Sequence, residues 1–138
     1  MKVYKFGGAS VRNADGVRNL AHIVDGESDL FIIVSAMGKT TNALERVFTH
    51  MQNGRKEEAN EEIKQVQDYH AAIIDDLWGE PTNINEVTLL FGQLRNIVND
   101  IVYRQSDAEL WYDTIVAYGE LISTTIISKY LIHIGMRN

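Results

Sequence analysis

The stretch KFGGASV, residues 5–11, decides the fold, because it joins a short β-prone run (VYKF, residues 3–6) to a helical pattern over residues 14–25. Glycines directly after a strand let the backbone approach a ligand closely. A helix that begins just afterwards directs free N–H groups and its positive dipole end to the same place. Lys5 adds a charge and Ser10 a hydroxyl, so the stretch is a candidate phosphate cradle. The alternative is that Gly7-Gly8 is only a tight turn, since neither Walker nor GxGxxG spacing is present.

A second loop of the same kind follows the next strand. LFIIVS, residues 30–35, is a continuous apolar run, which is typical of a parallel strand covered on both faces. SAMGKTTN, residues 35–42, then opens a helix, and the carboxyl ends of parallel strands face one ligand crevice. The alternative is that Thr40 or Thr41 only caps that helix. Strand, glycine loop and helix, repeated twice, indicate an α/β domain with a parallel sheet.

The middle of the chain predicts a long helical hairpin. Apolar residues recur at helical spacing over residues 55–79 and again over 84–102, with Gly79-Glu80-Pro81 as the turn between the two helices. A third helix is expected from an N-cap at Asp107 to Ile134, where Gly135 ends it. The sequence stops where the next strand is due, which predicts a truncated domain. The two predicted stripes are Ala59, Ile63, Val66, His70, Ile73, Leu77 and Ile84, Val87, Phe91, Leu94, Val98, Ile101.

The last helix carries a third motif, YGELIST, residues 118–124. A glycine inside a helix costs about 1 kcal/mol relative to alanine, so Gly119 predicts that another segment packs closely against it. Glu120 lies among apolar residues in the sequence, and a buried carboxylate needs a partner. A substrate ammonium would serve, but the residues alone favour a salt bridge to lysine or arginine.

The composition of the chain argues against several classes of function. A net charge of −6, from 13 basic and 19 acidic residues, argues against a nucleic-acid binder. The chain has no cysteine, and its four histidines lack metal-ligand spacing, so no metal site is expected. We find no secretory signal and no run near the roughly 20 apolar residues that cross a bilayer. Residues 126–134 are interpreted as a core helix, and a cytoplasmic protein without membrane contact is expected.

Together, the three motifs resemble those of the aspartate kinases. KFGGASV is similar to the family's K-F-G-G-[TS]-S-V, with Ala9 where threonine or serine is common. VSAMGKTTN is similar to V-S-A-x-x-x-x-T-[ND], and YGELIST to [SH]-x-G-E-x-x-S. The motifs occur in the family's order, and the match spans essentially residues 1–135.

The resemblance implies a fold and a reaction. The fold is a three-layer α/β/α sandwich of the amino-acid kinase (carbamate kinase-like) type, in which the helical hairpin is an insert. The reaction transfers the γ-phosphoryl group of ATP, with Mg²⁺, to the β-carboxylate of L-aspartate, the first step towards lysine, threonine and methionine. Aspartate kinases commonly dimerise, so a homo-oligomer is expected.

The resemblance also implies site residues. Lys5 matches the lysine that neutralises the transferring phosphoryl group, and it lies with Gly7, Gly8 and Ser10 around the ATP phosphates. Ser35, Thr41 and Glu120 match aspartate-binding positions, Glu120 being near the substrate ammonium. Because Ala9 leaves Ser10 intact, this departure is not expected to abolish function.

Several parts of the family's kinase are missing from residues 1–138. They are its later Gly-Gly-Ser-Asp loop, its adenine-binding segment, the arginine that holds the substrate carboxylate, and the regulatory ACT domains. We therefore interpret the chain as the N-terminal part of the catalytic domain, inactive alone. The alternatives are a non-catalytic dimerisation or binding module built on the hairpin, and a sister kinase acting on glutamate, acetylglutamate or UMP.

Overall fold

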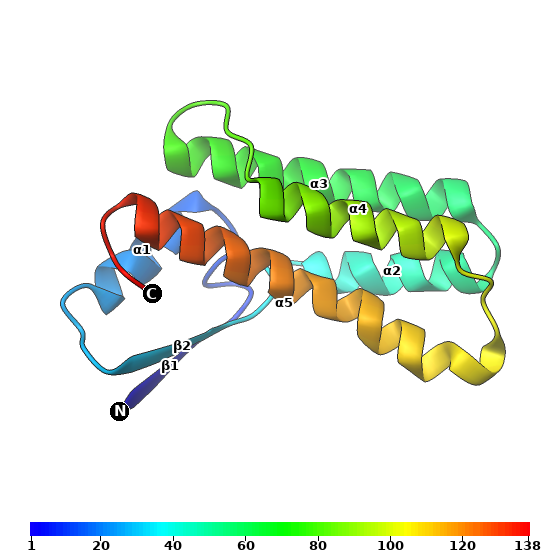
Figure 1. Cartoon of the computed structure of the whole chain (residues 1–138), viewed down its shortest axis with the longest axis horizontal. Helices are drawn as coiled ribbons and strands as arrows, with labels where there is room; N and C mark the ends of the chain where they lie inside the picture. The colour runs from blue at the N-terminus through cyan, green and yellow to red at the C-terminus, as the bar shows by residue number, and fades with distance from the viewer.

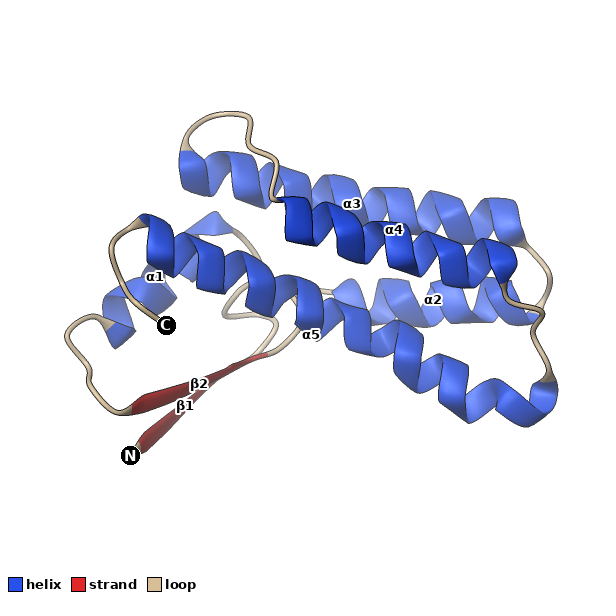
Figure 2. Cartoon of the chain, viewed as in Figure 1, coloured by secondary structure: helices blue, strands red, loops and turns tan.

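Two strands lie at one end of the molecule, and a set of long helices extends away from them (Figures 1 and 2). The structure is a computed structural model that describes residues 1–138. Its elements are β1 (Lys2–Phe6), α1 (Ala14–Val24), β2 (Leu30–Val34), α2 (Thr40–Gln52), α3 (Lys56–Trp78), α4 (Asn85–Asp100), the 3-10 turn η1 (Gln105–Asp107) and α5 (Ala108–His133).

The parallel sheet predicted from the sequence is present. β1 and β2 pair in parallel from Lys2 opposite Leu30 to Phe6 opposite Val34. Parallel strands need a crossover, and α1 provides it. The side chain of Asn13 accepts a hydrogen bond from the Gly16 N–H at 2.8 Å and caps this helix.

The prediction that β2 is covered on both faces was wrong. Side chains alternate across a strand, and one face of the sheet carries exposed apolar residues: Val3 is 53% exposed, Phe31 56% and Ile33 41%. β2 has a single neighbour, and α1 and α5 lie on the same side of the strands in Figure 1. A run of apolar residues predicts that a strand favours burial, but it does not show that other helices or strands are present to cover both of its faces. The three-layer sandwich therefore stays a prediction.

The two predicted helices of the middle segment are present as α3 and α4, which lie side by side in Figure 1. Gly79 ends α3 in the left-handed conformation, with φ of 75°, which glycine adopts at little cost. The predicted stripes are buried where α3 packs against α2 and α4, and where α4 packs against α5, although Ile101, just beyond α4, is only partly buried. That this helical pair is an insert in the family fold stays a prediction.

α5 crosses the whole molecule and contributes the largest share of the core. Asp107 precedes it as predicted, but its side chain makes no capping bond. At the other end Gly135, with φ of 93°, lets the Met136 N–H donate to the Leu131 carbonyl at 2.7 Å, and this bond closes the helix. The buried residues are Ile115, Gly119, Ile122, Ser123, Ile126, Ile127, Tyr130 and Leu131.

Residues Gln105–His133 are long and apolar enough to cross a membrane, and an apolar window of 18 residues within them has a mean hydropathy of 1.3. The expectation that no stretch reaches that range was therefore too strict. Half of the apolar window is buried inside the fold, and a core helix of a soluble domain meets the same length and composition. The packing of α5 against α2 and α4 agrees with the core interpretation.

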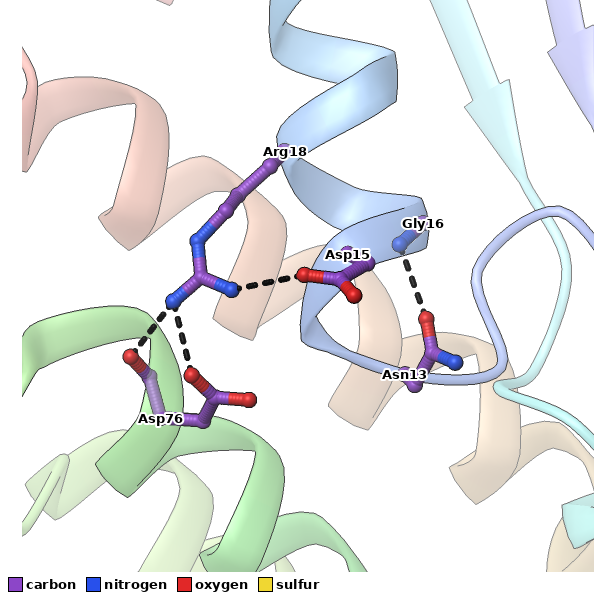
Figure 3. Close-up of polar contacts among 5 residues, drawn as sticks. All are labelled: Asn13, Asp15, Gly16, Arg18 and Asp76. Carbon is purple, nitrogen blue, oxygen red and sulfur yellow. Dashed lines mark hydrogen bonds and ion pairs between the residues drawn. The ribbon is translucent and has the colours of Figure 1, made fainter.

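Arg18 links α1 to the last turns of α3 through hydrogen bonds and an ion pair. Arg18 donates from Nη2 to the Asp76 carboxylate at 2.8 Å and to the Asp76 carbonyl at 2.7 Å, and from Nη1 to Asp15 at 2.9 Å (Figure 3). A cation at the carboxyl end of a helix is favourable because the macrodipole is negative there. The contact orients α1 against the helical part of the molecule.

His70 is a buried titratable group in the core. It is fully buried between the rings of Tyr69 and Phe91, its Nδ1 lies 2.7 Å from the Val66 carbonyl, and its Nε2 has no partner. Removal from water disfavours the imidazolium, so burial lowers the pKa of His70.

We predict that His70 makes the protein less stable in acid. The unfolded chain binds a proton at His70 near pH 6.5, whereas the folded chain binds it only at lower pH. The contribution of neutral His70 to the free energy of unfolding is therefore complete above about pH 6.5, and it is lost as the pH falls towards the pKa of His70 in the folded protein. Urea unfolding between about pH 7.5 and 5 should show a slope approaching 1.4 kcal/mol per pH unit that His70→Leu removes. His22→Gln, at an exposed position, should keep the slope, and an unchanged slope in His70→Leu would contradict the assignment.

Candidate functional site

The loops that follow β1 and β2 lie against each other, as the sequence predicted. A Cβ atom added to Gly8 would stand 2.8 Å from the Gly38 carbonyl oxygen and 2.9 Å from that of Ala36. The Gly38 N–H donates to the Gly8 carbonyl at 2.9 Å. No side chain larger than hydrogen fits at Gly8 without displacing the second loop.

The third motif packs behind the second loop. A Cβ atom added to Gly119 would lie 2.8 Å from the Ala36 Cβ, which confirms that another segment packs closely against this glycine. The Ser123 hydroxyl donates to the Ser35 carbonyl at 2.7 Å. The three motifs, far apart in sequence, thus meet at one place, which we call the glycine junction: Gly8, Ala36, Gly38 and Gly119.

Lys5 and Ser35 point to the same face of the sheet. Lys5 lies opposite Ile33 in the register, and Ser35 comes two residues after Ile33, with its N–H still donating to the Phe6 carbonyl at 2.9 Å. Because side chains alternate along a strand, both stand on the open face. Gly7 and Ser10 are exposed in the first loop, where the Ser10 N–H donates to the Gly7 carbonyl at 3.0 Å.

Thr41 and Glu120 each follow a residue of the contact between α2 and α5. A Cβ on Gly119 would lie 3.4 Å from the Thr40 methyl group, whereas Thr41 and Glu120 are exposed. Glu120 is exposed and takes part in no ion pair, so both its predicted apolar surroundings and the salt bridge were wrong. The buried side of α5 includes Gly119, and at about 100° per residue the next position turns towards solvent.

The polar side chains of the predicted site are all free. None of the five makes a hydrogen bond or an ion pair within the chain, so each is open to a ligand. They are Lys5, Ser10, Ser35, Thr41 and Glu120.

The amino end of α2 has no side-chain cap. Its N-cap residue, Lys39, makes no capping bond, and the Thr40 hydroxyl donates back to the Met37 carbonyl at 2.6 Å. The alternative that Thr40 or Thr41 caps this helix was therefore wrong. Since Asn13 already caps α1, the first turn of α2 is the better place for an anion to meet free N–H groups and a positive dipole end.

Sequence reasoning missed Tyr69 of α3. Its hydroxyl donates to the Arg12 carbonyl in the first loop, and its oxygen would lie 2.5 Å from a Cβ on Gly38 in the second. Gly38 has φ of +57°, which also favours glycine. Burial raises the pKa of Tyr69, so it stays a hydrogen-bond donor at neutral pH. Gly38 could have been found as a glycine after a strand, but nothing local marks Tyr69 as a loop contact.

Comparison with known families identifies the class of protein to which this arrangement of loops belongs. The family model described as "Amino acid kinase family" matches residues 1–138. The chain therefore belongs to the amino acid kinase family.

The chain is similar to curated aspartokinases. It is 30% identical to aspartokinase 1, chloroplastic, of Arabidopsis thaliana in an alignment 142 residues long that covers 98% of this chain and 24% of the relative. It is 32% identical to aspartokinase 2, chloroplastic, of the same plant (96% and 25%) and 29% identical to the aspartokinase of Chlamydia trachomatis (93% and 27%). The chain thus spans about a quarter of the length of these relatives.

Solved structures show the same fold. E. coli aspartokinase III in complex with lysine and aspartate (T-state) superposes with a TM-score of 0.78 at 24% identity, over 99% of this chain and 30% of that chain. The same enzyme in complex with aspartate and ADP (R-state) gives a TM-score of 0.73 at 25% identity, over 96% and 29%. The chain has the amino-acid kinase fold of these aspartokinases.

Two glycine substitutions test the glycine junction. Gly119→Ala should destabilise the protein by about 1–3 kcal/mol, because the new methyl group overpacks against Ala36. Gly92→Ala is the matched control, since it also lies inside a helix but a Cβ there meets nothing within 4 Å. It should stabilise by up to about 1 kcal/mol. Urea unfolding measures both, and equal effects would contradict the close approach of α5 to the second loop.

Proposed function

We propose that residues 1–138 form the N-terminal part of the catalytic domain of an aspartate kinase, which phosphorylates the β-carboxylate of L-aspartate with ATP. The observation that carries the proposal is the convergence of three motifs on the glycine junction, with five free polar side chains on and around it. The similar proteins are aspartokinases, and one solved neighbour holds aspartate and ADP. The alternatives in this family are kinases of other small acceptors.

The proposed chemistry needs positioning and charge neutralisation more than covalent help. The γ-phosphoryl group leaves the β-phosphate oxygen of ATP and bonds to a β-carboxylate oxygen of aspartate, giving aspartyl phosphate and ADP. Lys5 neutralises charge on the phosphoryl oxygens, while Gly7, Gly8 and Ser10 line the phosphate path. The acceptor carboxylate is ionised at neutral pH, so no general base is required.

The aspartate pocket is proposed on the other side of the junction. Ser35 and Thr41 supply hydroxyl groups to the substrate, and the free carboxylate of Glu120 pairs with the substrate ammonium. No three His, Asp or Glu side chains are close enough to hold a metal ion by themselves. Mg²⁺ is commonly held by substrate phosphates with one or two carboxylates, so we propose that it binds here with ATP, whose phosphate charge it would neutralise.

The open face of the sheet supports the three-layer sandwich. Val3, Phe31 and Ile33 form an exposed apolar surface of the kind that a further layer of helices would cover. We propose that this layer, the nucleotide half of the site and any regulatory domains are supplied by residues beyond these 138, with α3 and α4 as an insert. From the resemblance to the aspartate kinases we also propose that the full protein is a cytoplasmic homo-oligomer, and that residues 1–138 alone do not turn over substrate.

The first test supplies L-aspartate, ATP, Mg²⁺ and hydroxylamine to the protein encoded by the complete reading frame that contains this chain. Hydroxylamine displaces phosphate from aspartyl phosphate, and the aspartyl hydroxamate that forms is measured. Lys5→Ala should lower kcat by about 10²–10³-fold, as loss of one transition-state donor does. Lys2→Ala is the matched control, because Lys2 lies on the same strand but pairs with Glu27 at 3.1 Å. It should keep activity within about twofold.

Other outcomes of this assay bear on the alternatives. Hydroxamate formation from glutamate or acetylglutamate in place of aspartate, or ADP release with UMP as acceptor, would move the assignment to a sister kinase. A folded, complete protein without turnover of any of these would favour a binding or dimerisation module. Turnover by residues 1–138 alone would refute the proposed division of the active site.

A second prediction concerns substrate binding. Glu120→Gln keeps the shape of the side chain but removes the charge that faces the substrate ammonium, so KM for aspartate should rise about tenfold or more. KM for ATP should stay within about twofold. Steady-state kinetics in both substrates measure the split, and an equal rise in both constants would place Glu120 outside the aspartate pocket.

A further inference from the structure

A cavity of about 600 Å³ lies behind the two glycine loops, between them and helices α2 and α3. The first loop contributes Ala9, Arg12 and Asn13, and the second contributes Gly38 and Lys39. Such a volume falls in the range of small-molecule sites.

The cavity is separate from the proposed catalytic site. None of the seven residues assigned to ATP or aspartate lines it. Ala43 and Arg46 of α2 face the cavity, and at about 100° per residue Thr41 is roughly 200° around the helix from Ala43. Thr41, the residue of α2 assigned to aspartate, thus lies on the opposite side of the helix from Ala43.

The charge of the cavity is positive in a chain whose net charge is −6. Arg46 is neutralised by Glu62, at 3.0 Å. Arg12 and Lys39 face the cavity without any acidic partner, since neither takes part in an ion pair or donates a side-chain hydrogen bond. Lys39 also stands at the uncapped amino end of α2. These features share a preference for an anion.

The remaining lining is suited to an apolar or planar group. Tyr69, which is 37% exposed, contributes an aromatic ring whose hydroxyl already donates to the Arg12 carbonyl. Ala43 and Val66, which are 8% and 5% exposed, form the apolar floor beside it. A site with a predominantly apolar wall and a few convergent polar groups is typical of pockets for small organic ligands. Inorganic phosphate could pair with Arg12 and Lys39, but it has no apolar group that would contact this wall.

We propose that this cavity binds a small organic anion, a carboxylate or a phosphate ester with a planar apolar body. Arg12 and Lys39 hold the anionic group, and the body lies over Ala43, Val66 and Tyr69. The binding is independent of the proposed kinase reaction, because it uses none of that site's residues.

The test is a titration of the 138-residue chain, labelled with ¹⁵N, with phenyl phosphate followed by amide NMR shifts. Shifts that saturate should centre on the backbone amides of Gly38, Lys39 and Tyr69. Inorganic phosphate and phenol, which each supply half of the ligand, should bind at least about tenfold more weakly. The double variant R12Q/K39Q should lose at least about tenfold in affinity while keeping a folded spectrum.

Matched variants separate this site from others. R104Q/K129Q removes one arginine and one lysine far from the cavity and should leave the affinity unchanged. Shifts that centre on Ser10 and Thr41 and disappear in K5Q would place the anion in the proposed catalytic site and overturn the proposal. Shifts centred on Val3, Phe31 and Ile33, or none up to about 10 mM ligand, would overturn it as well.

Discussion

The rest of the structure depends on the close approach of the loop after β1 to the loop after β2. Parallel pairing of the strands brings both loops to the same edge of the sheet. Only a glycine at position 8 lets them touch, because a Cβ there would stand 2.8 Å from the Gly38 carbonyl oxygen. The same restriction recurs behind the second loop, where Gly119 lets α5 reach Ala36. The absence of a side chain at Gly8 and Gly119 thus fixes how the sheet and the helices fit together.

The packing that secures the loops leaves their polar groups free. Ser123 and Tyr69 hold the loops through backbone carbonyls, those of Ser35 and Arg12, so the side chains of the proposed site take no part in holding the fold. Because backbone contacts fix the geometry of the loops, the polar side chains stay available to bind the substrates. Such preorganisation is what phosphoryl transfer requires.

The sequence predicted the local structure well, because each signal in it was local. Glycines after strands, the stripes of α3 and α4, and the break at Gly79 all follow from backbone preferences and periodicity. The predictions from the sequence failed where burial or pairing depends on residues that are distant in the chain. The run Leu30–Val34 has the letters of a strand buried on both faces, yet no element covers Phe31 and Ile33. Glu120 was assigned a salt bridge because its neighbours in sequence are apolar, whereas its neighbours in space leave it exposed. The role of Tyr69 depends on α3 reaching both loops, which no local pattern reports.

The most direct test of the central claim is a crystal structure of the complete protein with L-aspartate, Mg²⁺ and a non-hydrolysable ATP analogue. The account predicts the Lys5 Nζ within about 3 Å of a γ-phosphate oxygen and the Glu120 carboxylate within about 3 Å of the substrate ammonium. The glycine junction between Gly8, Ala36, Gly38 and Gly119 should be unchanged. Aspartate bound away from the junction, or a γ-phosphate that Lys5 does not contact, would contradict the account.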